Sequence, residues 1–245
     1  MQSQEGIVVR TYDYRETSLL VDVLTPDWGG IRMIARGARD PSRGMTAIFL
    51  PLNRILIHFY PGRNIHLLGK GELLSWYPRI RSSLNRYLFS LLLLEISFLL
   101  HAPDQRGLFY LLREVLSYVD RESRIYYDLL FSYFSLRVLK FAGFSPFLTS
   151  CVVCEKNTKP EHYSVELGGI LCESCWKRDP KSLTIDEDTR ANLMGIPRLK
   201  LSQLNKIVVS PSTRKRIKDI VYRHLLYRLE IKPPSLRFWE EIFGE

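Results

Sequence analysis

Residues 151 to 175 read Cys151-Val-Val-Cys154, then seventeen residues that include Gly168-Gly169, then Cys172-Glu-Ser-Cys175, and they hold all four cysteines of the chain. The two-residue gap within each pair lets both thiolates reach one tetrahedral ion at about 2.3 Å. The spacer length suits two such pairs that close on one zinc ion, and the two glycines can supply the positive φ that turns the chain back. The spacing therefore predicts one structural Zn²⁺, held by Cys151, Cys154, Cys172 and Cys175, with no open position for catalysis.

Two other uses of these cysteines have weaker support. Disulfides suit secreted chains, but Met1-Gln-Ser-Gln-Glu5 lacks the basic and apolar regions of a signal peptide. A thioredoxin-like redox pair needs only one Cys-x-x-Cys, beside a strand–helix unit. The longest apolar stretch, 89–100, is interrupted by polar residues and is too short to span a bilayer. We therefore expect a reduced, cytoplasmic protein with no membrane partner.

Composition limits the class of protein. The chain has 245 residues, of which 46% are hydrophobic and 25% charged, as is typical of globular proteins. Lys and Arg number 35 against 26 Asp and Glu, which gives a net charge of +9. This balance favours an anionic partner, either nucleic acid or a membrane surface. It is equally compatible with a surface that is merely soluble.

The first eighty residues are patterned as strands. Strand-favouring, partly alternating runs occur at 6–13, 18–25, 31–37, 52–60 and 65–74. Five short strands predict a small closed barrel, for which the OB-fold is a common solution. Alternation places one set of polar side chains on a shared face of the third and fourth strands, namely Arg32, Arg36, Arg54, His58 and Tyr60. This set suits single-stranded nucleic acid, although it could also be a solvated outer face.

The loop from Gly37 to Gly44 carries Arg39 and Arg43 between its glycines. Arginine forks match phosphate oxygens, so the loop is a candidate for phosphate contact. A plain solvated loop explains the same residues.

After Tyr77-Pro78 the apolar period changes to about 3.6, which predicts helices at 82–101, 107–120 and 123–141. Glu95 lies within an apolar stretch, and we expect it to hydrogen-bond across the helical bundle. Helical patterning resumes after Pro180, so the metal module is inserted into a helical domain. The predicted α+β organisation is an OB-fold domain (1–79), a first helical part (80–145), the zinc module (146–180) and a second helical part (181–245).

The stretch from Arg198 to Arg237 is the most basic, with eleven Lys and Arg against two acidic residues. Ser210 or Ser212 is expected to cap a helix there, with Lys215, Lys218 and Arg223 largely outward. Such charge favours an anion-binding role over a solvated helix face. The candidates for binding DNA or the acidic tail of a partner are Arg214, Lys215, Lys218 and Arg223.

Several motifs follow one another along the chain: Gly6-Ile-Val-Val-Arg10, Ala35-Arg-Gly-Ala-Arg39, Leu50-Pro51, the stretch from Gly143-Phe-Ser-Pro146 through the four cysteines, and Lys232-Pro-Pro-Ser235-Leu236. In this order and combination they resemble the RecO family of bacterial recombination mediators. The resemblance covers nearly the whole chain. Two residues depart from the family pattern: Asp40 lies in a loop that is usually more basic, and Glu155 stands where a small residue is common.

The resemblance implies a non-enzymatic, nucleoid-associated DNA repair protein. Its expected activities are binding of single- and double-stranded DNA, annealing of complementary strands, and help in loading RecA onto coated strands. The expected protein partners are RecR and the acidic, Phe-ended C-terminal tail of the single-strand DNA-binding protein, with RecA an indirect one. The competing interpretations are a zinc-ribbon RNA-binding or transcription-associated protein, a zinc enzyme that acts on nucleic acid, and a protein-binding scaffold.

Overall fold

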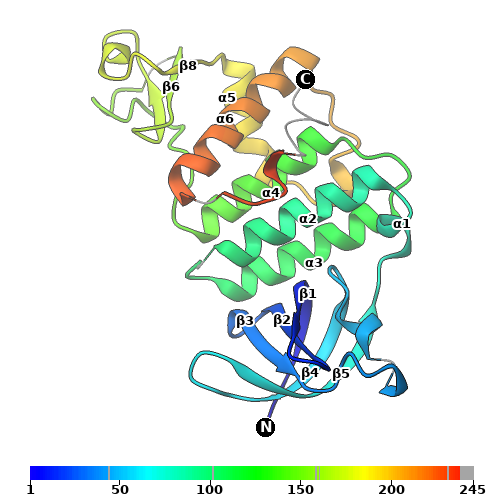
Figure 1. Ribbon diagram of the computed structural model, residues 1–245. Coiled ribbons are helices and arrows are strands. Elements are labelled where there is room, and N and C mark those ends of the chain that lie inside the picture. Colours follow the sequence, from blue (N-terminus) through cyan, green and yellow to red (C-terminus); the bar gives the residue numbers. More distant parts are fainter. Residues whose placement is uncertain (44, 101, 158, 160, 231, 238–245) are drawn as a thin grey trace. The chain divides into compact units, whose positions relative to one another are not determined.

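The computed structural model describes the chain except for residues 44, 101, 158, 160, 231 and 238–245 (Figure 1). By its contacts the chain divides into two compact units. Unit 1 comprises Met1–Arg121 together with the segment that begins at Pro233, and unit 2 comprises Glu122–Lys232. This division cuts across the four expected segments, because the first helices pack on the barrel.

Unit 1 begins with a five-stranded closed barrel. Its strands are β1 (Gln2–Tyr14), β2 (Ser18–Thr25), β3 (Gly29–Ala35), β4 (Arg54–Tyr60) and β5 (His66–Ser75). The order is β1-β2-β3-β5-β4, and β4 also pairs with β1. Only the β3–β5 pair is parallel among these strands. This arrangement confirms the predicted OB-type barrel.

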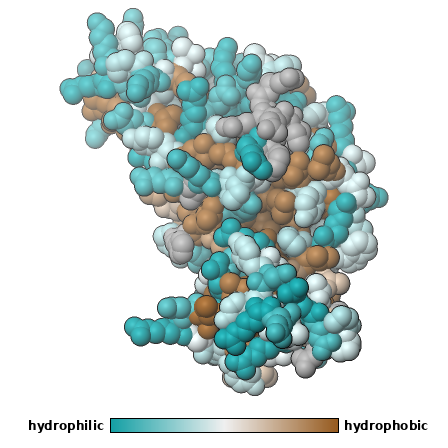
Figure 2. Space-filling view, in the orientation of Figure 1, coloured by the Kyte–Doolittle hydropathy of each residue, from teal (hydrophilic) through white to brown (hydrophobic). Residues whose placement is uncertain are grey.

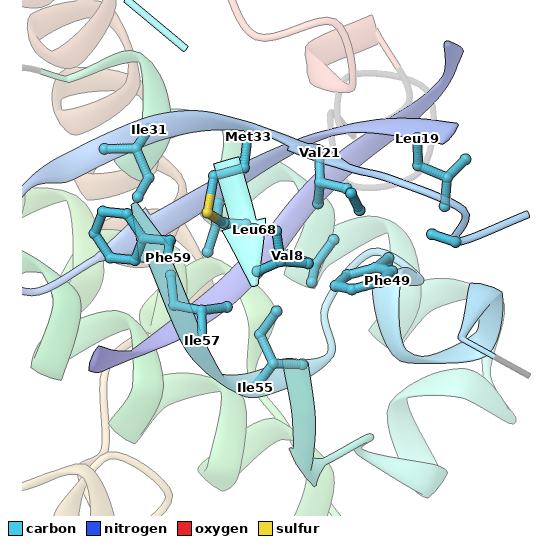
Figure 3. Close-up of a cluster of buried hydrophobic side chains, with 13 residues drawn as sticks. Val8, Leu19, Val21, Ile31, Met33, Phe49, Ile55, Ile57, Phe59 and Leu68 are labelled. Carbon is cyan, nitrogen blue, oxygen red and sulfur yellow. The ribbon is translucent and has the colours of Figure 1, made fainter. Parts of the chain in front are cut away.

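The barrel interior is filled by alternate residues of β2, β3 and β4, together with Val8 of β1 and Leu68 of β5 (Figure 3). On β3, Ile31, Met33 and Ala35 are buried, whereas Arg32 is exposed. Strand β4 repeats the alternation with Ile55, Ile57 and Phe59 inside. The predicted strand faces are confirmed, and burial of this apolar surface is the main force that stabilises the barrel.

Three helices follow the barrel in unit 1: α1 (Pro78–Arg81), α2 (Leu84–Leu99) and α3 (Gln105–Arg121). Both α2 and α3 contact the sheet of β1, β2 and β3 (Figure 1). The turn into β3 permits this approach, because Gly29 has a φ of +63° and a Cβ at Gly30 would lie 2.8 Å from the Phe98 ring. Only glycine allows both conditions without displacement of a neighbour.

Glu95, on α2, binds the C-terminal segment, which we define as Pro233–Arg237. Its Oε2 accepts hydrogen bonds from the backbone N–H of Ser235 at 2.9 Å and from the hydroxyl of Ser235 at 2.7 Å. The expected partner lies across the helical bundle, but the observed partner is Ser235, a turn residue 140 positions later in the same unit. The contact holds part of the Lys232-Pro-Pro-Ser235-Leu236 motif against unit 1.

Unit 2 contains the remaining long helices and a small sheet. Its elements are α4 (Tyr127–Phe141), β6 (His162–Ser164), β7 (Gly169–Leu171), β8 (Leu183–Thr184), α5 (Glu187–Gly195) and α6 (Pro211–Leu229). The sheet order is β7-β6-β8. Short 3-10 helices lie at Trp176–Arg178, Ile196–Arg198 and Leu201–Gln203 in this unit, and at Pro41–Arg43 and Thr46–Phe49 in unit 1. None of the described helices combines the length and apolar content that a membrane crossing requires.

Helix α6 begins as predicted but is covered on more than one side. Ser210 is the cap, since its hydroxyl accepts from the Thr213 N–H at 3.1 Å. Both α4 and α5 pack against α6. For this reason Lys218, expected to face outward, is only 7% exposed. The expectation for Lys218 was wrong because an apolar stripe alone does not reveal a second neighbouring helix.

Candidate metal centre and nucleic-acid interface

The four cysteines converge on one point in unit 2. Their sulfur atoms all lie within 4.8 Å of one another. The Sγ atoms of Cys154 and Cys172 are 3.8 Å apart, which is about the edge of a tetrahedron with 2.3 Å metal–sulfur bonds. A disulfide would need about 2.05 Å, so the two cysteines are not bonded to each other. The cluster is placed to bind a metal ion with four sulfur ligands.

Local backbone geometry positions each pair. In the first knuckle the Glu155 N–H donates to the Cys151 carbonyl at 2.8 Å, and Glu155 takes a φ of +60°. In the second, the N–H groups of Cys175 and Trp176 donate to the Cys172 carbonyl. Gly168 turns the chain between them with a φ of +81°, as predicted. The positive φ of Glu155 explains why a small residue suits that position.

The close approach of the four sulfurs affects how readily each thiol ionises. Burial opposes ionisation of Cys151, but N–H groups of Cys154, Cys172 and Val153 outweigh it, so that the pKa of Cys151 falls to about 6. The neighbouring sulfur of Cys172 raises the pKa of Cys175 to about 12. One thiolate therefore forms readily and then disfavours the others. A divalent cation removes this repulsion, because metal binding requires and stabilises the deprotonated thiols.

The metal module is attached to α6 through a buried hydrogen-bond chain. The Tyr163 hydroxyl on β6 lies 2.7 Å from His224 Nδ1, and His224 Nε2 lies 2.9 Å from the Phe144 carbonyl. Because a carbonyl only accepts, Nε2 carries the proton and Nδ1 accepts from Tyr163. Burial lowers the pKa of His224, which keeps the ring neutral. Arg228 adds a second link, as it donates to the Glu166 carbonyl at 2.7 Å.

On the barrel, the predicted residue Arg32 is part of an ion-pair cluster. Its Nε and Nη2 donate to the two oxygens of Asp22 at 2.6 and 2.9 Å. Arg10 donates to the same carboxylate at 3.0 Å. Asp22 is completely buried, and this hydrogen-bonded carboxylate raises the pKa of Arg32. The side chains of Arg10 and Arg32 remain 37% and 43% exposed, so two half-exposed guanidinium groups share one hidden negative charge.

The predicted residues on β4 lie on one outer face, as their alternation requires. Arg54 pairs with Glu5 at 3.5 Å, and Arg113 of α3 pairs with the other Glu5 oxygen at 3.2 Å. His58 lies 2.5 Å from the Ser3 hydroxyl. Tyr60, in contrast, is 51% exposed at the end of the strand. The charge of Arg54 is therefore partly neutralised by Glu5, whereas Tyr60 is open to a partner.

The remaining predicted cations follow β3. Arg36 is exposed and makes no ion pair with any residue that the structure describes. Arg39 pairs with Asp13 at 3.2 Å. Arg43 lies in a 3-10 helix, but its side chain is outside the described part. The face of the barrel that Figure 2 shows is largely hydrophilic, with small hydrophobic patches.

Three residues of this face were not singled out from the sequence: Arg10, Tyr12 and Asp22. Tyr12 is 44% exposed, and the guanidinium carbons of Arg10 and Arg32 each lie 6.0 Å from its ring centre. The signal was present in Asp22, a lone carboxylate within the apolar run Leu19-Leu-Val-Asp-Val-Leu24. A buried charge in a strand requires a partner, and its cross-strand neighbours are Arg10 and Arg32.

The α6 candidates differ in availability. Arg214 is held in a fork by Asp128 at 2.6 and 2.5 Å, and Lys218 is buried. Lys215 and Arg223 are exposed. Arg223 also lines a hollow of about 530 Å³ between α6 and the metal module, together with Lys181, Leu183, Tyr222, Leu226 and Tyr227 among others. Of the four candidates, only Lys215 and Arg223 are therefore accessible to a partner.

These features define a class: an α+β protein with an OB-type barrel, of the kind that binds oligonucleotides, and a helical unit with four cysteines placed for a metal ion. Comparison with known families identifies which one. The family models "Recombination protein O N terminal" and "Recombination protein O C terminal" match residues 1–77 and 81–237. The chain therefore belongs to the RecO family of DNA repair proteins.

Individual relatives support the same family assignment. The chain is 27% identical to DNA repair protein RecO of Halalkalibacterium halodurans over 240 residues, which are 97% of this chain and 94% of that protein. It is 28% identical to DNA repair protein RecO of Syntrophomonas wolfei, with 86% of this chain and 85% of that protein covered. The similarity spans both units, and it supports a role in DNA repair and recombination.

Proposed function

We propose that the chain is a non-enzymatic mediator that binds single- and double-stranded DNA, anneals complementary strands and helps to load RecA onto coated strands. The observation that carries the proposal is that the two family models together match nearly the whole chain. The oligonucleotide-binding type of barrel and its exposed cations support it. The proposed location is the cytoplasm, in association with the nucleoid.

Annealing needs no acid or base. Two DNA strands repel each other through their phosphates, and a basic protein that neutralises both lowers that barrier. Aromatic contacts to the faces of bases leave the pairing edges available. Arg36 and Tyr60 are exposed in unit 1, as are Lys215 and Arg223 in unit 2. Each unit thus offers groups that suit a nucleic-acid strand.

We propose Zn²⁺ as the ion at the cysteine cluster. Four thiolates at tetrahedral spacing match the closed sites that zinc occupies in proteins. The ion would supply structure to the module and no catalytic water, since all four positions are filled by sulfur. The residues that would hold it are Cys151, Cys154, Cys172 and Cys175.

For protein partners we propose RecR and the acidic, Phe-ended tail of the single-strand DNA-binding protein. The hollow beside α6 supports the second, because its lining combines apolar surface with the cations Arg223 and Lys181. The lining also contains Glu166 and Asp179, so the aromatic end of the tail and the exposed Arg223 carry the proposal more than net charge does. An acidic peptide with a terminal aromatic ring suits such a mixture. We expect Arg223→Glu to weaken binding of a labelled tail peptide by tenfold or more in fluorescence anisotropy. Lys215→Glu, on the same helix but outside the hollow, is the matched control and should change binding much less.

The decisive experiment is annealing of two complementary oligonucleotides, followed by fluorescence, in a salt series without nucleotide. Rapid annealing that declines steeply with salt supports the proposal. The reaction is then repeated on strands coated with single-strand-binding protein, with and without its tail. If low salt produces neither annealing nor single-strand binding, the proposal is wrong. A preference for structured RNA would instead favour an RNA-binding or transcription-associated protein.

A further inference from the structure

The outer face of β1, β2 and β3 is built from three cross-strand rows. The first row is Arg10, Asp22 and Arg32, and the second is Tyr12, Leu20 and Ile34. In the third row Tyr14 pairs with Ser18, while Arg36 follows directly after Ala35, the partner of Leu19. An aromatic and aliphatic row therefore lies between two rows that carry arginine.

The middle row can receive a flat apolar group. Tyr12 is 44% exposed, and Leu20 and Ile34 are half-buried beside it. The ring of Tyr12 is bordered by Arg10 and Arg32 on the side of the first row. Nucleic-acid bases stack on such rings whatever their identity, because every base has a π-face.

The outer rows can receive phosphates, and each adjoins a hollow. The hollow beside Arg32 measures about 450 Å³ and is also lined by Asn64, His66 and Phe98. The hollow beside Arg36 measures about 750 Å³ and includes Tyr14, Arg15 and one carboxylate, Glu16. Arg32 lies on β3, and Arg36 is the first residue after this strand ends. A single strand of DNA that crosses this face would meet cations on both sides of the aromatic row.

Asp22 keeps the first row in place. It is completely buried and accepts three hydrogen bonds from the two arginines. Arg10 also lies 5.4 Å from the Phe98 ring centre, which limits its motion on the other side. Because one carboxylate serves two guanidinium groups, the row keeps a net positive charge while its side chains are oriented.

We infer that Tyr12 is a base-stacking residue for single-stranded DNA, with Arg10, Arg32 and Arg36 as its flanking phosphate contacts and Asp22 as the positioning residue for Arg10 and Arg32. The inference rests on the proposed DNA-binding function and adds the place and the residues. A surface that is only solvated needs no exposed ring between two rows of arginine. It also needs no buried carboxylate to orient them.

The test measures binding of the full-length protein to a single-stranded oligonucleotide with one central 2-aminopurine, whose fluorescence is quenched by stacking. We expect Tyr12→Leu to weaken binding by about 5- to 150-fold and to remove most of the quenching. Its salt dependence should stay unchanged, since no phosphate contact is lost. Tyr12→Phe should bind as the wild type does. Arg36→Gln should reduce the slope of log affinity against log salt by about 0.7.

Tyr110→Leu is the matched control, because Tyr110 is 47% exposed and lies under a single guanidinium, that of Arg113. It should bind and quench normally. Asp22→Asn separates positioning from charge: it adds one positive charge, so a purely electrostatic role predicts tighter binding. Positioning predicts weaker binding and weaker quenching instead. Circular dichroism melting confirms that each variant is folded.

The possible results distinguish failure of the Tyr12 inference from failure of the proposed DNA-binding function. Wild-type binding together with unchanged affinity and quenching in Tyr12→Leu overturns this inference and leaves the proposed function intact. Tighter binding by folded Asp22→Asn overturns the positioning role. If the wild type itself fails to bind at low salt, the proposed function fails, and this inference fails with it.

Discussion

Tyr163→Phe tests the buried chain that attaches the metal module to α6. The substitution keeps the ring and removes only the hydroxyl that donates to His224 Nδ1 at 2.7 Å. Both residues are almost fully buried, so Nδ1 would be left without water or partner. Leaving a buried acceptor unsatisfied costs about 1–3 kcal/mol. We therefore expect the free energy of unfolding of unit 2 to fall by that amount at pH 7.5.

The assay is urea unfolding of the full-length protein followed by circular dichroism, with the metal present in excess. Hydrogen–deuterium exchange locates the loss, which should appear in β6, β7 and α6 and not in the barrel. Tyr227→Phe makes the same chemical change on an exposed ring of α6 and should stay within about 0.5 kcal/mol of the wild type. If Tyr163→Phe is equally stable, or if Tyr227→Phe loses as much, the network does not hold the module.

The burial of His224 also predicts how the free energy of unfolding depends on pH. Burial lowers the pKa of His224 below its ordinary value of about 6.5, so the unfolded chain binds the proton more readily than the folded one. Stability should therefore fall as the pH decreases below about 6.5, by at most about 1.4 kcal/mol per pH unit from this group. His224→Gln, measured over the same range, isolates this contribution from protonation of the cysteines. Parallel curves for the two proteins would refute the assignment.

Further predictions concern single residues. Cys172→Ser should lower bound zinc, measured by atomic emission, from one ion per chain to well below one and increase exchange in 146–180 only; full zinc content would contradict the four-cysteine site. Glu95→Gln weakens charge-assisted bonds to the C-terminal segment, so we expect a loss of about 1 kcal/mol and faster exchange there, against no change for exposed Glu114→Gln. Gly30→Ala should cost about 1–3 kcal/mol because its Cβ would meet the Phe98 ring at 2.8 Å. Gly195→Ala, where the Cβ meets nothing within 4 Å, should instead stabilise α5 by about 0.5–1 kcal/mol; equal melting temperatures for these two variants would contradict the packing.

Sequence predicted the features that depend on neighbours along the chain. The Cys151–Cys175 spacing gave the ligand set because each knuckle is a local turn. Alternation gave the strand faces of the barrel, and Ser210 gave the start of α6. These properties follow from periods and caps that need no knowledge of distant residues.

The sequence alone could not predict which basic side chains remain accessible to an anionic partner. Arg214 is engaged by Asp128, 86 positions earlier, and Arg54 by Glu5 on a different strand. Lys218 is buried because two helices, and not one, cover α6. Each outcome depends on tertiary neighbours, and a stretch with eleven basic residues therefore says little about where a phosphate binds.

Pairing with Asp22 does more to Arg10 and Arg32 than neutralise part of their charge, because it also orders their side chains. An unpaired arginine has many rotamers, and ordering one costs up to about 2 kcal/mol when a ligand arrives. Asp22 orders Arg10 and Arg32 beforehand and hides its own charge beneath them. Since the carboxylate is shared, one positive charge remains for a phosphate. The proposed annealing activity requires strands that are held but can still move to find their complement, and a preordered, partly neutralised row next to an exposed ring suits both requirements.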